Sequence, residues 1–160
     1  MTARLNLFSN PTATAAKAAR HFGAASRTIL EESTLPTATQ KLVLLRASQI
    51  NGCGYATDVW SKNAAHAGET TTRVNLVTAW RESTVFTDAE RAALELAEQG
   101  TRIADAAGGV TDEAWANVAE HYDEDQLADL VMLIALINAT NRMGVIVGRR
   151  GGDYQPGQVG

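Results

Sequence analysis

The stretch LVLLRASQINGCGYATDVWSKNAAHAG, residues 42–68, decides the fold. It opens with a run of apolar residues, which predicts a largely buried helix that stops at Gly52, because glycine favours the backbone conformation found at helix ends. Cys53 follows at once, and residues 54–67 predict a further helix ended by Gly68. The chain therefore turns between two helices and places its single cysteine at or near a helix N-terminus.

Capping signals mark the starts of other helices. Thr87 with Glu90 has the spacing of a capping box, in which each side chain bonds the backbone N–H of the other residue. Asp123 opens a long apolar helix in the same way. Asn10 and Pro11 predict a helix start with proline at the first helical position.

Capping-box spacing also joins Thr37 to Gln40, ahead of the apolar run. No stretch sustains the alternation of apolar and polar residues that a half-buried strand requires. The sequence therefore predicts an all-α bundle of about seven helices. They span approximately residues 11–32, 37–51, 54–67, 70–80, 87–103, 111–121 and 123–147.

One domain is expected over residues 1–160, because no internal repeat or long linker divides the chain. The glycine-rich tail, residues 148–160, offers little apolar surface. We expect it to be either mobile or laid against another subunit.

Composition and charge exclude several classes of function. The formal net charge of −4 gives no basic field that would hold nucleic acid. The most apolar run, residues 130–137, is too short for a membrane span and predicts a buried core helix. A single cysteine allows no internal disulfide, and residues 1–10 lack the pattern of a signal peptide, so we expect a cytoplasmic protein that does not contact the membrane.

Residues 42–68 resemble the segment of the alkylhydroperoxidase D and carboxymuconolactone decarboxylase-like family that runs Leu-Arg-x-Ser-x-x-Asn-x-Cys into Cys-x-x-Cys-x-x-x-His. The resemblance continues through AWRES at 79–83, FTDAERAALELAE at 86–98 and INATNRMG at 137–144. It implies an AhpD-like helical fold, a peroxiredoxin-type antioxidant oxidoreductase activity without a cofactor, and homo-oligomers, commonly trimers or hexamers.

The family's redox residues are mostly replaced. Members with hydroperoxidase activity use two cysteines, a histidine four residues after the second, and an upstream glutamate. In this chain the first cysteine position is Cys53, the second is Ala56, and the histidine position is Trp60. The upstream acid position is Lys41, and Tyr55 stands where some members carry a second histidine.

These replacements limit the chemistry to one thiol. Cys53, Ala56 and Trp60 are three and four residues apart, so they share a helix face. A peroxide would oxidise Cys53 to a sulfenic acid, but Ala56 cannot condense with it, so recovery requires an external thiol reductant. Lys41 would stabilise a thiolate if it lies near, yet an ammonium has no lone pair and cannot act as a base.

Each candidate also has a purely structural interpretation. Cys53 behaves as a small buried hydrophobe if it is sealed in the core. Tyr55 and Trp60 either line an apolar pocket or anchor the core or an interface, and Lys41 is equally interpreted as a solvated surface charge. The three histidines are scattered, so no metal site is expected.

Three functions remain open. The leading hypothesis is an alkylhydroperoxidase-like protein with at most one-cysteine reactivity at Cys53. The second is a non-catalytic oligomeric binding or scaffold protein that holds a small apolar molecule beside Tyr55 and Trp60. The third is decarboxylation of a carboxymuconolactone-type substrate, which no residue in the sequence specifically supports.

Overall fold

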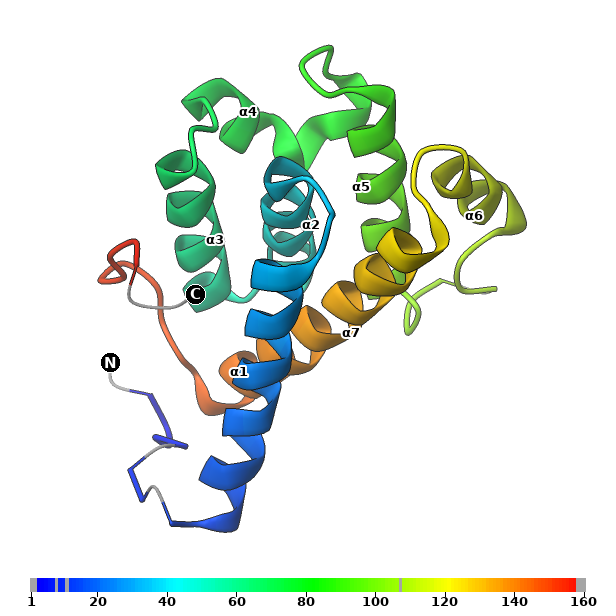
Figure 1. Cartoon of the computed structure of the whole chain (residues 1–160). Helices are drawn as coiled ribbons and strands as arrows, with labels where there is room; N and C mark the ends of the chain where they lie inside the picture. Colours follow the sequence, from blue (N-terminus) through cyan, green and yellow to red (C-terminus); the bar gives the residue numbers. More distant parts are fainter. Residues whose placement is uncertain (1–2, 8, 11, 107, 158–160) are drawn as a thin grey trace.

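The computed structural model describes residues 3–7, 9, 10, 12–106 and 108–157, and this part of the chain contains helices and no strands (Figure 1). The prediction of an all-α fold with about seven helices is confirmed. The helices are α1 (Thr14–Glu32), α2 (Thr37–Ile50), α3 (Gly54–His66), α4 (Thr71–Leu76), the 3-10 helix η1 (Val77–Glu82), α5 (Asp88–Thr101), α6 (Asp112–Ala119) and α7 (Glu124–Val147).

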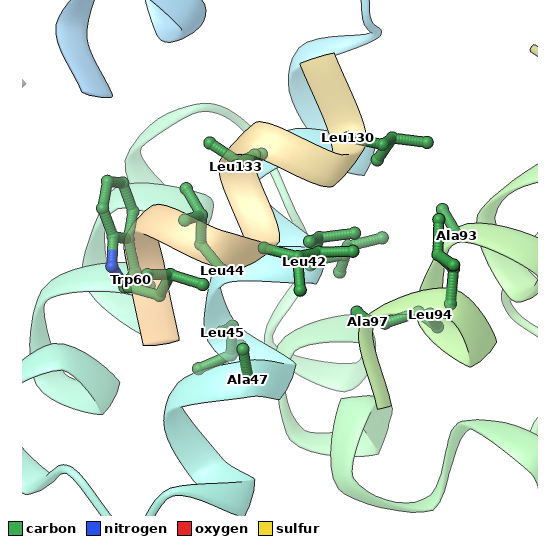
Figure 2. Packing of buried hydrophobic residues seen from close by; sticks show 14 of the residues in the cluster. Leu42, Leu44, Leu45, Ala47, Trp60, Ala93, Leu94, Ala97, Leu130 and Leu133 are labelled. Atoms are coloured by element: carbon green, nitrogen blue, oxygen red, sulfur yellow. The ribbon is translucent and has the colours of Figure 1, made fainter. Parts of the chain in front are cut away.

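Helix α2 lies at the centre of the bundle, where it packs against α3, α5, η1 and α7. Residues 42–48 are all buried, so every face of this part of the helix is covered. The core around it is built from leucines of three helices, among them Leu42, Leu94 and Leu130 (Figure 2). Truncating one of these side chains to alanine would cost about 2–5 kcal/mol.

Helix α7 is long and apolar enough to cross a membrane by length and composition, with a mean hydropathy of 1.8 over its most apolar window. In this fold 44% of that window is buried, and the helix packs against α1, α2, α3, α5 and α6. These contacts place the helix within the bundle. The helix begins with a capping box between Asp123 and Gln126 and ends at Gly148, which adopts a left-handed φ of 70°.

The capping box of α5 is also confirmed, since Thr87 Oγ1 accepts from the N–H of Glu90 and the Thr87 N–H donates to Glu90 Oε2. The box expected at α2 is wrong. Pro36 takes the N-cap position there without a side-chain bond. Gln40 lies one residue too far along the helix to close a box, and its buried amide donates to the Leu35 carbonyl at 3.1 Å.

The start of α1 also differs from the prediction. Asn10 Oδ1 accepts hydrogen bonds from the backbone and hydroxyl of Thr12, so it caps a turn ahead of the helix. Ala13 is the N-cap residue, and the helix begins at Thr14. Pro11, expected at the first helical position, lies outside the described residues.

Two further boundaries are corrected. The helix expected over residues 70–80 is divided into α4 and η1, and Ala79 leaves helical geometry with φ −120° and ψ 33°. Helix α5 ends at Thr101, so Ile103 does not extend its buried face and is 62% exposed.

The described part of the tail, residues 148–157, packs against α3 of its own chain, so the expectation that it is mobile is wrong. Its contact with another subunit stays a prediction. Asp58 Oδ2 accepts from the backbone N–H of Gly152 at 2.7 Å and of Tyr154 at 3.3 Å. The Tyr154 ring is buried, and its hydroxyl donates to Asn63 at 2.8 Å. The buried ring of Tyr154 in the tail and the carboxylate of Asp58 on α3 thus hold the tail in place, although its glycine-rich sequence offers little apolar surface.

Candidate functional site

A cavity of about 630 Å³ lies between the N-terminal segment (residues 3–7), α1, α3 and α7. This volume falls within the range of about 300–1,000 Å³ that is usual for small-molecule sites. The wall is mainly apolar, with contributions from every one of these helices, and neither Asp nor Glu is among its described lining residues. The apolar lining includes Leu30, Val59, Leu133, Leu136, Ile137 and Val147.

Cys53 forms part of this wall. It occupies the N-cap position of α3 in an extended conformation, and its side chain makes no capping hydrogen bond. Its backbone is fixed on both sides, because its N–H donates to the Ser48 carbonyl at 3.1 Å and its carbonyl accepts from Thr57 at 2.9 Å. The residue is only 2% exposed, so a molecule reaches its sulfur through the cavity and not from bulk solvent.

Two glycines allow this position of the thiol. Gly52 adopts a left-handed φ of 63° between α2 and α3, a conformation that other residues rarely adopt. On α7, a Cβ added at Gly144 would lie 3.1 Å from Cys53 Sγ. The absence of a side chain at Gly144 therefore lets α7 approach the sulfur closely.

The structure brings Ala56, Tyr55 and Trp60 to the same cavity as the thiol. Ala56 and Trp60 are each 8% exposed, and Figure 2 shows the Trp60 indole beside Leu44. Tyr55 is half-buried. The α3 residues beside the thiol therefore carry the methyl group of Ala56 and the indole of Trp60. Neither group forms a disulfide or accepts a proton from a peroxide.

Lys41 lies behind this wall. Its Nζ is 5.4 Å from the centre of the Trp60 ring, and the side chain is half-buried but does not line the cavity. Burial lowers the pKa of Lys41 below its ordinary value. The ammonium contacts the Trp60 indole as a cation–π partner. Lys41 is therefore the one of the five candidate residues that stands outside the cavity wall, where Cys53, Tyr55, Ala56 and Trp60 lie.

Sequence reasoning missed two arginines that line the cavity, Arg27 of α1 and Arg149 just after α7. Arg149 stacks on Tyr55 with its guanidinium carbon 3.3 Å from the ring centre. Gly148 turns the chain there, and the Arg149 N–H bonds back to the Gly144 carbonyl at 2.8 Å. Neither arginine belongs to a sequence motif, so only the fold reveals their place in the wall.

The polar side chain of Asn141, which lines the cavity, already has a hydrogen-bond partner. Asn141 is fully buried and bonds Ser48 of α2, whose hydroxyl also donates to the Leu44 carbonyl at 2.7 Å. These contacts join α7 to α2. Within the described ranges, no group of three or more His, Cys, Asp or Glu side chains is arranged to hold a metal ion.

Solved structures of other proteins share this fold. A protein of unknown function from Agrobacterium tumefaciens, whose name suggests antioxidant defence of the AhpD type, has a TM-score of 0.85 and 29% identity, with 96% of this chain and 100% of that chain covered. A variant of the debrominase Bmp8 in complex with 2,3,4-tribromopyrrole has a TM-score of 0.75 at 21% identity, covering 84% of this chain and 71% of that chain, which supports the fold alone.

Two bacterial proteins of uncharacterised function are similar in sequence. YdfG of Bacillus subtilis is 39% identical over 120 residues, which cover 75% of this chain and 80% of that protein. YnjA of Escherichia coli is 31% identical over 112 residues, which cover 70% of this chain and 60% of that protein. The model of the carboxymuconolactone decarboxylase family matches residues 14–99, more than half of the chain. The protein is therefore a member of the carboxymuconolactone decarboxylase family, with an AhpD-like fold.

Proposed function

We propose that this protein binds a small organic hydroperoxide in the cavity and reduces it with Cys53 as a single thiol. The observation that carries the proposal is the place of Cys53 in the wall of an apolar cavity of about 630 Å³. An apolar wall favours the hydrocarbon part of such a molecule, and the adjoining thiol is the nucleophile that a peroxide requires.

The proposed reaction balances in two stages. The Cys53 thiolate attacks one peroxide oxygen, so an S–O bond forms, the O–O bond breaks, and the departing alkoxide takes a proton from water to become an alcohol. Sulfur is oxidised to sulfenic acid and the peroxide is reduced. One external thiol then displaces water to give a mixed disulfide, and a second external thiol releases Cys53 as the thiol together with the external disulfide.

The dependence on an external thiol follows from the neighbours of Cys53. Ala56 and Trp60 lie at the same cavity and carry no sulfur. Among the described residues Cys53 is a free cysteine. We place the activity in the cytoplasm, where low-molecular-weight thiols supply the reductant.

Trapping of the sulfenate tests the proposal. Reduced protein is treated with cumene hydroperoxide in the presence of dimedone and digested for mass spectrometry, with Cys53→Ser as the control. We expect one dimedone adduct at Cys53, and peroxide consumption beyond one equivalent only when an external thiol is present. Absence of the adduct, or repeated turnover without added thiol, would overturn the proposal.

A second candidate is a binding protein without catalysis, which the 2% exposure of Cys53 and the position of Lys41 behind Trp60 favour. Under this alternative a Cys53→Ala variant binds a naphthalene-type fluorescent probe as tightly as the parent protein, and the dimedone experiment gives no adduct.

We also propose a homo-oligomer, because Val131, Met132 and Ile146 expose apolar side chains on α7. Light scattering on the purified protein measures its subunit number, and we expect more than one subunit.

A further inference from the structure

The charged side chains that line the described wall of the cavity are positive. Arg27 and Arg149 are its charged lining residues, and no carboxylate stands among the described residues that face it. The chain as a whole is acidic, with a formal net charge of −4. A positive wall in an acidic protein favours an anionic ligand at this place.

Neither guanidinium is committed to an acidic partner. The ion pairs within the described part of the chain join other arginines and Lys62 to Asp and Glu, and none includes Arg27 or Arg149. Arg149 is instead stacked on Tyr55, an arrangement that holds the guanidinium plane and leaves its N–H edges available. Such an edge matches the two oxygens of a carboxylate.

The charged residues of the site and the residues around the thiol differ in their exposure to solvent. Arg27 and Arg149 are exposed, whereas Cys53, Ala56 and Trp60 are buried. Between them the wall is formed by apolar side chains of α1, α3 and α7. A ligand that satisfies both regions has an anionic head in contact with solvent and an apolar body that extends inward.

We infer that the cavity selects an amphipathic carboxylate, with its head bound by Arg27 and Arg149 and its hydrocarbon body reaching toward Cys53. The inference rests on the proposed use of this cavity as the ligand site. It deepens that function, because the hydroperoxide substrate would then be one carried on the hydrocarbon part of an organic acid.

Three ligands that differ only at the head test the selection. Decanoate, decanol and decylamine are titrated at neutral pH into the reduced parent protein, with isothermal calorimetry as the readout. We expect decanoate to bind about tenfold more tightly than decanol, and decylamine to bind most weakly. Raising the salt concentration should weaken decanoate binding and leave decanol binding unchanged.

Matched variants locate the preference. Arg27→Gln and Arg149→Gln should each reduce the ratio of decanoate to decanol affinity severalfold. Arg20→Gln on α1 and Arg150→Gln beside Arg149 remove the same charge from arginines that do not line the cavity, so the ratio should stay unchanged. Equal affinity for decanoate and decanol in the parent protein, or equal effects of all four variants, would overturn the inference.

The ligand titrations and the sulfenate-trapping experiment test the two proposals independently. Decanoate carries no peroxide, so its binding is independent of Cys53 chemistry. A clear preference for decanoate without a sulfenate adduct would remove the proposed function and keep the anion site. An adduct formed with cumene hydroperoxide and no preference for decanoate would do the reverse.

Discussion

Helix α7 meets the candidate thiol at a single glycine: a Cβ added at Gly144 would lie 3.1 Å from Cys53 Sγ. This separation is tighter than an ordinary van der Waals contact, so the sulfur would have to shift by a few tenths of an ångström. Gly144 is buried in the interior of a helix, where glycine normally lowers stability. Glycine at position 144 therefore lowers the helix propensity of α7 but leaves room for the sulfur of Cys53.

A double-mutant cycle measures this coupling. In a Cys53→Ala background the clash is absent, so Gly144→Ala should raise the free energy of unfolding by about 0.5–1 kcal/mol, the usual helix-propensity gain. With Cys53 present we expect the same substitution to give a smaller gain or a loss. Urea unfolding of the four proteins provides the measurement, and identical effects of Gly144→Ala in both backgrounds would show that the sulfur does not press on α7.

Glu98 joins three elements at one carboxylate. Its Oε2 accepts from Arg46 Nη2 of α2 at 2.8 Å and from Trp80 Nε1 of η1 at 3.1 Å. Burial alone would raise the pKa of Glu98, but the hydrogen bonds from Arg46 and Trp80 outweigh it and hold that pKa below its ordinary value. The ionised carboxylate is thus the form that the fold stabilises.

Glu98→Gln should therefore lower the free energy of unfolding by roughly 3 kcal/mol, near the lower end for loss of one partner of a buried ion pair. Glu95→Gln is the matched control on the same helix, because Glu95 forms a looser pair with exposed Arg81 at 3.6 Å and should cost less than about 1 kcal/mol. Chemical denaturation compares the two variants. Similar losses for both would contradict the role assigned to Glu98.

The fold follows from the sequence where one local signal is sufficient. The capping boxes at Thr87 and Asp123 form because both partners lie within one helical turn. Gln40 has the same spacing but is drawn into the core, where its amide bonds Leu35. Burial in the tertiary structure, which the spacing does not encode, overrides the capping preference there.

The candidate site was only partly predictable for a related reason. Helical spacing indicates that Cys53, Ala56 and Trp60 share a face, and all three line the cavity. The opposite wall comes from residues 3–7, α1 and α7, which no local pattern links to Cys53. Arg27 was missed because its contribution depends on how α1 crosses α7, a packing relationship between distant segments.

The attachment of the tail to α3 should depend on pH. Burial by itself would raise the pKa of Asp58, but hydrogen bonds from Lys62, Gly152 and Tyr154 hold it below the ordinary value of 3.8. A depressed pKa means that the folded state favours the carboxylate, so this stabilisation is present above 3.8 and is lost as the pH falls through the lower folded value. Amide exchange at Gly152 and Tyr154, corrected for the intrinsic rate at each pH, should therefore accelerate at acid pH.

Asp58→Asn should bring about the same release at neutral pH. An amide offers one acceptor oxygen without charge, so the ion pair with Lys62 and the charge-assisted bonds to the tail are lost or weakened. We expect faster amide exchange and proteolysis over residues 151–155. Asp153→Asn removes the same charge from an exposed position in the tail and should change neither rate. Equal protection in both variants would show that Asp58 does not hold the tail.

Restoring the missing cysteine tests the geometry of the thiol directly. Cys53 is the N-cap residue of α3 and Ala56 is its third helical residue, the two positions whose groups meet in every capping box. Ala56→Cys should therefore form an intramolecular disulfide with Cys53 when one equivalent of cumene hydroperoxide is added, seen as the loss of both free thiols in a thiol assay. Ser61→Cys places a second thiol about 12 Å farther along the helix, beyond the reach of a disulfide. It should leave Cys53 as a trappable sulfenic acid, and survival of that sulfenic acid in Ala56→Cys would mean that the Cys53 side chain points away from position 56.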